Sequence, residues 1–240
     1  MQIPRIYQNT PLAKNVQLNL QAMQHVVTVL RLATGAPVIL FNGDNFEYHG
    51  ELVLYDKRTA VVNIKEKIFQ NRESPLKIHL AQGIARGEKM DLIIQKAVEL
   101  GVHEITPLFT LRCNVKLDQT RLEKRVLHWQ QVAISAAEQC GRNQITTIHL
   151  PCNFAHFIAH CASEKKFILS HRADHNLNAL TDTLTECALL VGPEGGFDSS
   201  ELHQAQQSNF QPLLLGPRIL RTETAALVAV SLLQGRFGDL

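Results

Sequence analysis

Residues 187–197 read CALLVGPEGGF, and residues 213–225 read LLLGPRILRTETA. Each stretch begins with a short apolar run of the kind that forms a buried strand. The first run breaks at Gly192 and the second at Gly216, each time in a glycine-proline loop that leads towards a helical segment. Strand, loop and helix in this order, occurring twice, predict an α/β fold.

The two loops are candidates for a ligand site. Ligands of open α/β sheets bind just past the carboxyl ends of the strands. Glycine lets the main chain approach a ligand closely, and proline stiffens the loop. Each loop alone is equally well explained as a plain strand-to-helix turn. Neither carries a nucleotide-phosphate signature, because both G-x-x-x-x-G-K-[ST] and G-x-G-x-x-G are absent.

GPEGGF followed by LGPRILRTETA resembles the RsmE family of SPOUT-type methyltransferases, and matches elsewhere extend the resemblance over nearly the whole chain. These supporting matches are Arg5-Ile6-Tyr7, residues 89–101 and residues 136–142. The resemblance implies methylation of N3 of a uridine in 16S ribosomal RNA of the small ribosomal subunit, with S-adenosylmethionine (SAM) as the cofactor. It also implies a homodimer and a C-terminal segment threaded into a deep trefoil knot.

We expect two domains, with the polar stretch 71–75 as the linker. Residues 1–72 are rich in short strand patterns, and the resemblance implies a PUA-like RNA-binding β-barrel there. Residues 73–240 alternate strands with helices, and the resemblance implies a SPOUT methyltransferase domain with a mostly parallel sheet. The expected elements of the first part are a helix at 16–32, a run at 36–41 closed by the turn Asn42-Gly43-Asp44, strands at 46–55 and 59–64, and a turn at 56–58.

In the second part, apolar spacing predicts both strands and helices. The expected strands are 76–84, 104–109, 167–170, 188–191 and 213–215. The expected helices are 88–100 and 121–139, one that begins at the Asp198-Ser199-Ser200-Glu201 signature, and a last one capped by Thr222-Glu223. For that last helix, we expect Ala225, Val228, Ala229 and Leu232 to face the core.

The residues expected at the methyltransferase site are a SAM-binding set and two single candidates for the chemistry. The resemblance implies that SAM is bound by Leu169, Ser170, His171, Gly192, Pro193, Glu194, Gly195, Gly196, Leu215, Gly216, Arg218, Ile219, Leu220, Thr222, Thr224 and Ala225. Uridine N3 must lose its proton before it attacks, so a fixed guanidinium would stabilise the resulting anion. Arg221 is the candidate for that role. Glu223 is a candidate base, or alternatively a helix cap.

Two arginines are assigned to RNA by the resemblance, Arg5 and Arg142. A surface charge is the alternative for Arg5, and an ion pair with Glu138 that closes the helix is the alternative for Arg142. Because N3 lies on the pairing edge of the base, the uridine has to be unpaired or flipped out.

No metal is expected. Cys152, His156 and His160 follow a helical spacing, with Cys161 beside them, but a fourth ligand for structural zinc is missing. A helix face with partly buried histidines is the preferred interpretation. The H-x-x-x-H spacing of His171 and His175 lacks the glutamate of a zinc protease.

The bulk composition is that of an ordinary globular protein, with 240 residues, 45% hydrophobic and 19% charged. The start lacks a signal-peptide pattern and five scattered cysteines suit reduced thiols, so we expect a cytoplasmic protein. A net charge of +2 alone indicates no partner. The competing hypotheses are a ribose 2′-O methyltransferase, a non-catalytic RNA-binding protein and a nucleotide hydrolase.

Overall fold

The computed structural model describes residues 3–54, 59–113, 119–171, 173 and 183–240. The chain forms two compact units. Unit 1 comprises Met1–Glu73 and Ala137–Ile145, and unit 2 comprises Ser74–Ala136 and Thr146–Leu240. The first boundary between the units follows Glu73, one residue after the expected domain boundary. The inclusion of residues 137–145 in unit 1 was not predicted.

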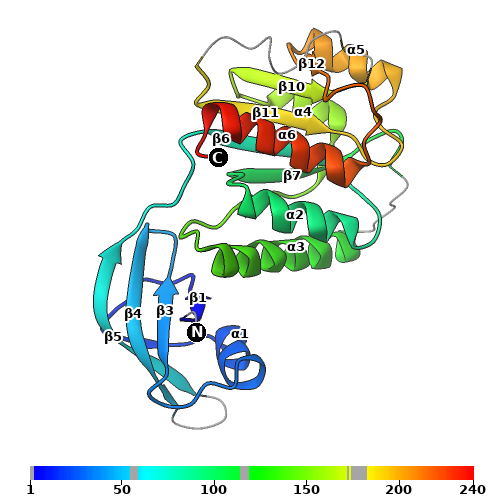
Figure 1. Ribbon diagram of the computed structural model, residues 1–240. Coiled ribbons are helices and arrows are strands. Elements are labelled where there is room, and N and C mark those ends of the chain that lie inside the picture. Colours follow the sequence, from blue (N-terminus) through cyan, green and yellow to red (C-terminus); the bar gives the residue numbers. More distant parts are fainter. Residues whose placement is uncertain (1–2, 55–58, 114–118, 172, 174–182) are drawn as a thin grey trace. The chain divides into compact units, whose positions relative to one another are not determined.

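Unit 1 is built on a five-stranded sheet in the order β1-β3-β4-β5-β2, which curls around its own core (Figure 1). β1 pairs with β3 in parallel, and the other pairs are antiparallel. The predicted hairpin turn at residues 42–44 joins β3 to β4 and is confirmed. The strands are β1 (Arg5–Tyr7), β2 (Asn15–Gln17), β3 (Pro37–Phe41), β4 (Phe46–Leu54) and β5 (Ala60–Phe69).

Unit 1 differs from the expectations in three respects. β1 was missed, and β5 runs five residues past the expected end because 66–69 pair with 46–49. The predicted helix 16–32 is instead the strand β2 followed by α1 (Leu20–Gln24) and the π-helical turn η1 (His25–Val29). Asn19 begins α1 by accepting a 2.9 Å hydrogen bond from Ala22 N. The residues before it are held in the sheet, where Leu18 N donates to Ala60 O. The expected turn 56–58 lies outside the described residues.

Unit 2 contains a parallel sheet in the order β12-β10-β11-β6-β7-β8, with β9 also paired to β7. The predicted parallel α/β architecture is therefore confirmed. The strands are β6 (Lys77–Gly83), β7 (Glu104–Phe109), β8 (Thr147–Ile148), β9 (Cys152–Asn153), β10 (Lys165–Leu169), β11 (Glu186–Val191) and β12 (Gln211–Leu213).

Helices cover both faces of this sheet (Figure 1). On one face, Phe154 and Phe157 of α4 and Ala205 of α5 share a core with Ala81, Ala188 and Leu190 of the strands. On the other face, α6 packs against α2 and β11. The helices of unit 2 are α2 (Lys89–Glu99), α3 (Gln119–Cys140, its last residues in unit 1), α4 (Phe154–His160), α5 (Ser199–Gln207) and α6 (Thr222–Phe237).

The start of α5 forms as predicted. Asp198 and Glu201 make a reciprocal capping box. The Asp198 side chain accepts a hydrogen bond from the main chain at Glu201, and the Glu201 side chain accepts one from the main chain at Asp198. The predicted helix 88–100 is confirmed as α2, and Gly101 ends it with φ of 80° and a 3.0 Å bond from its N–H to Val98 O.

The last helix differs from its prediction in two ways. Its buried apolar residues are Ala226, Ala229, Val230 and Leu233, so of the expected core face only Ala229 is buried. The helix is apolar almost all round, and periodicity cannot set the phase of such a helix. Arg221 is the N-cap residue and makes no side-chain cap, so the expected cap by Thr222-Glu223 is wrong.

One strand end is also corrected. β12 ends at Leu213 rather than at Leu215; Leu214 forms an isolated bridge, and Leu215 belongs to the loop that follows. Within the described residues, no helix combines the length and the apolar character that crossing a membrane requires.

Candidate functional site

A cavity of about 240 Å³ opens at the carboxyl ends of β10, β11 and β12. Both glycine-proline loops contribute to its wall, as expected for an α/β sheet. Of the sixteen residues expected to bind the cofactor, all except Thr224 line it. Lining residues that were not predicted are Arg112, Val191, Phe197, Leu202, Leu213 and Leu214.

The loop after β11 packs so closely that side chains are excluded at two glycines. A Cβ added to Gly83, the last residue of β6, would lie 2.5 Å from Cδ of Pro193. One added to Gly192 would lie 3.0 Å from the main chain of Gly196. Glycine is therefore required here for space, and the loop is held rigidly against the end of β6.

Two polar side chains, Thr222 and Gln82, tie this loop to α6 and β6. The Thr222 hydroxyl donates a 2.6 Å hydrogen bond to the carbonyl oxygen of Gly192. In turn, Nε2 of Gln82 donates to the Thr222 hydroxyl over 3.0 Å and to Gly83 O over 2.9 Å. Gln82 is fully buried and Thr222 nearly so. Because buried polar groups are costly when unpaired, this network fixes the loop in one position.

Charged groups hold the outer part of the same loop. Oε1 of Glu194 accepts a 3.0 Å hydrogen bond from the main-chain N–H of Arg86 and lies 3.8 Å from Nζ of Lys89. Burial alone would raise the pKa of Glu194, but these partners outweigh it and the pKa is lowered. Nζ of Lys89 also lies 3.4 Å from Oε2 of Glu223.

Arg112, in the loop after β7, is the most notable lining residue that sequence reasoning missed. Its guanidinium donates a hydrogen bond of 3.3 Å to Gly195 O and one of 2.9 Å to Oδ2 of Asp198, the N-cap residue of α5. The available signal was its position three residues past the predicted strand 104–109, at the same sheet edge as the two loops.

The two candidate catalytic residues do not line the cavity in this chain. Arg221 is exposed and sits between the lining residues Leu220 and Thr222. Glu223 is held by Lys89, as described above. Thr224, expected to bind the cofactor, is exposed on the first turn of α6 and is also outside the wall.

Arg5 and Arg142 are buried in unit 1, so an exposed phosphate contact is not what the structure shows for either. Arg5 is 8% exposed and forms an ion pair with Glu47. Its guanidinium also donates a 2.6 Å hydrogen bond to Oδ1 of Asn143. Arg142 pairs with Glu73 over 2.5 Å rather than with Glu138. Buried guanidiniums are normally paired in this way, and these pairs hold residues 137–145 against the sheet of unit 1.

Glu138 has a different partner from the expected one. Oε1 of Glu138 accepts a 2.9 Å hydrogen bond from the main-chain N–H of Tyr7. Burial raises the pKa of this carboxyl, and the nearby Tyr7 N–H and Arg5 only partly oppose it.

The cysteine and histidine run near α4 does not form the expected face. Cys152 lies in β9, outside the helix, while His156 and His160 stack at 4.3 Å and are exposed rather than partly buried. His171 lines the cavity, whereas His175 lies outside the described residues.

Comparison with known proteins agrees with this architecture. A family model described as an RNA methyltransferase domain matches residues 72–234. A second, described as an RNA methyltransferase PUA domain, matches residues 22–65.

Relatives and solved structures of similar length also match. Ribosomal RNA small subunit methyltransferase E of Buchnera aphidicola subsp. Schizaphis graminum is 39% identical, over 99% of this chain and 98% of that protein. The Bacillus subtilis protein of the same name is 32% identical, over 88% of this chain and 86% of that protein. A crystal structure of ribosomal RNA small subunit methyltransferase E from Neisseria gonorrhoeae bound to SAM superposes with a TM-score of 0.92, at 35% identity and full coverage of both chains. A Legionella pneumophila protein solved with bound SAM gives a TM-score of 0.97 at 42% identity, again with full coverage of both.

Proposed function

The chain belongs to the ribosomal RNA small subunit methyltransferase E family, and on this premise we propose that it methylates N3 of a uridine in 16S ribosomal RNA. SAM supplies the methyl group. The observation that carries the proposal is the cavity at the carboxyl ends of β10, β11 and β12, which both predicted loops line. Solved relatives with the same fold hold SAM.

The residues of the cavity fit this cofactor. Its wall is mostly main chain and apolar side chains, among them Leu169, Leu215 and Leu220, which suit the flat adenine. At Gly196 and Gly216, an added Cβ would project into open space, with no atom within 4 Å. The absence of a side chain there leaves room for the ligand to approach the main chain. The tie between Gln82, Thr222 and Gly192 keeps this wall in place before the ligand arrives, which reduces the ordering that binding requires.

Arg221 is the residue we assign to the chemistry. Loss of the N3 proton leaves a negative charge spread over N3 and the two carbonyl oxygens of the base. The exposed guanidinium of Arg221 sits at the start of α6, where the helix dipole adds positive potential. A preorganised positive group there would stabilise the anion. Glu223, held by Lys89, is left with the role of an acidic residue in the first turn of α6, favourable to the dipole.

Two further features follow from family membership as part of the proposal. We infer a trefoil knot, supported by the path of the chain end, because α6 follows the edge strand β12 yet returns across the sheet to Gln82 of β6. We also infer a homodimer, supported by Ile219, which lines the cavity yet is 84% exposed. An apolar side chain this exposed beside a site is well placed to be covered by a partner.

The N-terminal unit is proposed to hold RNA as a PUA-like domain while the uridine is flipped out for reaction. Since Arg5 and Arg142 are buried in internal ion pairs, phosphate contacts are expected from exposed basic side chains such as Lys65, whose ion pair with Glu51 lies at the surface. A ribosomal substrate would place the reaction in the cytoplasm.

Nucleoside mass spectrometry of 16S ribosomal RNA tests the function. A strain without this gene should lack 3-methyluridine in that RNA, and the gene supplied on a plasmid should restore it. A Gly195→Val variant, which fills the cavity wall, should not. Persistence of the modified base in the deletion strain, or loss of a ribose 2′-O-methyl mark instead, would overturn the proposal.

A further inference from the structure

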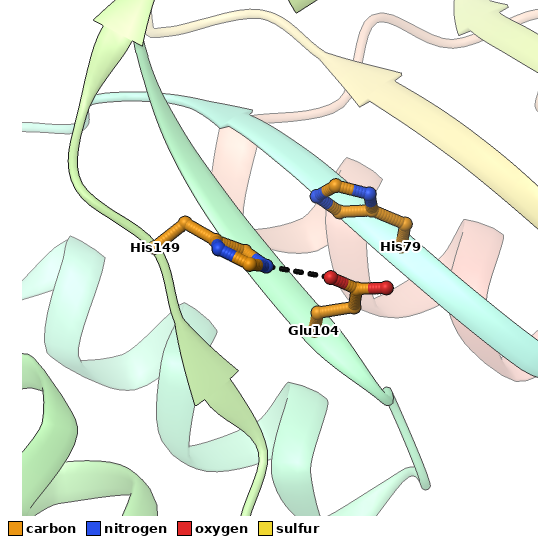
Figure 2. Close-up of side chains that lie close together, drawn as sticks. All are labelled: His79, Glu104 and His149. Carbon is orange, nitrogen blue, oxygen red and sulfur yellow. Dashed lines mark hydrogen bonds and ion pairs between the residues drawn. The ribbon is translucent and has the colours of Figure 1, made fainter. Parts of the chain in front are cut away.

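A cluster of three potential ligands lies in unit 2, outside the cofactor cavity. His79 is in β6, Glu104 begins β7, and His149 follows β8 directly. The three strands are neighbours, and the register pairs His79 with Glu104 and Glu104 with Thr147. Figure 2 shows the three side chains turned towards one another on one face of the sheet.

The donor atoms are close together. Nε2 of His149 lies 2.5 Å from Oε2 of Glu104, and the rings of His79 and His149 are 5.5 Å apart between centroids. One donor atom from each of the three lies within 4.8 Å of the others. Within the part of the chain that the structure describes, this is the one group of three such residues.

This cluster is separate from the proposed methyltransferase site. Glu104 is the first residue of its strand and His79 the third of its own, so both lie towards the amino ends of the parallel strands. The cavity opens at the carboxyl ends. None of the three residues lines it, and nothing in the proposed chemistry requires them.

The surroundings hold the ring of His79 in place. His79 lies in β6, which pairs with β7 on one side and with β11 on the other. Nε2 of His79 is also within 2.8 Å of the Thr106 hydroxyl, and the ring packs edge-on against Phe157 at 5.2 Å. Such partners fix a ligand ring in orientation.

We propose that His79, Glu104 and His149 form a binding site for a divalent transition-metal ion of the zinc type. Two imidazoles and one carboxylate are a ligand set that zinc accepts, with the remaining position open to water. Nickel and copper share the preference for imidazole, so the class is set by chemistry rather than by one element.

The geometry requires one small adjustment. With metal–ligand bonds of about 2.0–2.1 Å in a tetrahedral arrangement, the His149 and Glu104 donor atoms must separate by roughly 0.8 Å from their present 2.5 Å. His149 follows a two-residue strand and its side chain is 41% exposed, so it can move outwards. His79, which is partly buried and held by Thr106 and Phe157, provides the fixed ligand.

The experiment is a titration of the full chain, stripped of metal with a chelator, with Zn²⁺ by calorimetry and with Co²⁺ by visible absorption. We compare the wild type with His149→Ala and Glu104→Gln. The matched control is His160→Ala, which removes an exposed imidazole stacked on His156. Circular dichroism in the absence of metal establishes that each variant is folded.

The wild type and His160→Ala should bind one ion per chain. His149→Ala and Glu104→Gln should lose at least about tenfold in affinity, given that even outer partners of metal ligands contribute that much. Zn²⁺ should also raise the melting temperature of the wild type and of His160→Ala but not of Glu104→Gln, because an ion that binds only the folded state stabilises it.

Three outcomes would overturn the inference. One is the absence of stoichiometric binding by the wild type. Another is unchanged binding by folded His149→Ala and Glu104→Gln. The third is a strong sulfur-to-cobalt charge-transfer band, which would assign the ion to cysteine thiolates instead.

Discussion

Replacing Thr222 by valine removes one hydroxyl from the network behind the cofactor cavity while keeping the shape of the side chain. The hydroxyl oxygen lies 2.6 Å from Gly192 O and 3.0 Å from Nε2 of Gln82, and the residue is 5% exposed. After the change, Gly192 O keeps only a long 3.4 Å contact with Gln82, and Gln82 keeps its bond to Gly83 O.

The cost follows from these contacts. Leaving a buried acceptor without its donor typically costs about 1–3 kcal/mol. For a protein of this size each kcal/mol lowers the melting temperature by roughly 2–4 °C, so we expect a fall of about 2–12 °C. The loop of Gly192 also becomes free to leave its binding position. A loss of about 1 kcal/mol in the bound geometry would lower SAM affinity roughly fivefold.

Thermal unfolding and calorimetric SAM titration measure both effects. Thr222→Ser keeps the hydroxyl and should retain most of the affinity. Thr224→Val makes the same chemical change as Thr222→Val two residues along α6, at an exposed position, and should stay within about 0.5 kcal/mol of the wild type. If Thr222→Val and Thr224→Val unfold and bind SAM alike, the network does not hold the cavity wall.

Gly195→Val should abolish measurable SAM binding in a folded protein, because even a Cβ there lies 3.0 Å from Cβ of Arg112; near-normal affinity by calorimetry would contradict this. Arg221→Ala should lower single-turnover methylation on the order of a hundredfold with little change in SAM affinity. The reverse pattern would make Arg221 a cofactor residue. Glu138→Gln keeps an acceptor for Tyr7 N–H and should be more stable than the wild type at pH 8 but not near pH 4. The reason is that burial raises the pKa of Glu138. Its contribution to the free energy of unfolding is therefore present below the pKa of the unfolded state, about 4.3, and is lost as the pH rises through the pKa of the folded state. Urea unfolding at both pH values checks the sign. Sedimentation at micromolar concentration should show a dimer, and a fully active monomer would refute that proposal.

The sequence predicted the parts of unit 2 that depend on turn and helix-cap residues. Gly101 ends α2, Asp198 and Glu201 begin α5, and the two glycine-proline loops meet at one cavity. These features depend on residues near one another in the chain, and turn and cap chemistry are local.

The parts that failed depend on partners distant in sequence. The burial of Arg5 is set by Glu47 and Asn143, which no local pattern connects to it. The cluster of His79 and Glu104 exists only because β6 and β7 pair in one register. The phase of α6 could not be read because an all-round apolar helix has no polar face to orient it.

The bond from Gln82 to Thr222 joins residues 140 positions apart, and that from Thr222 to Gly192 spans 30. Contacts this distant in sequence form late, since the chain between them must first be closed into a loop. During synthesis, the cavity wall therefore cannot be completed until the start of α6 has left the ribosome. Before that point SAM has no complete site to bind, and it cannot stabilise the growing chain through this cavity. Loss of the last helix should accordingly remove cofactor binding as a whole rather than weaken it by degrees.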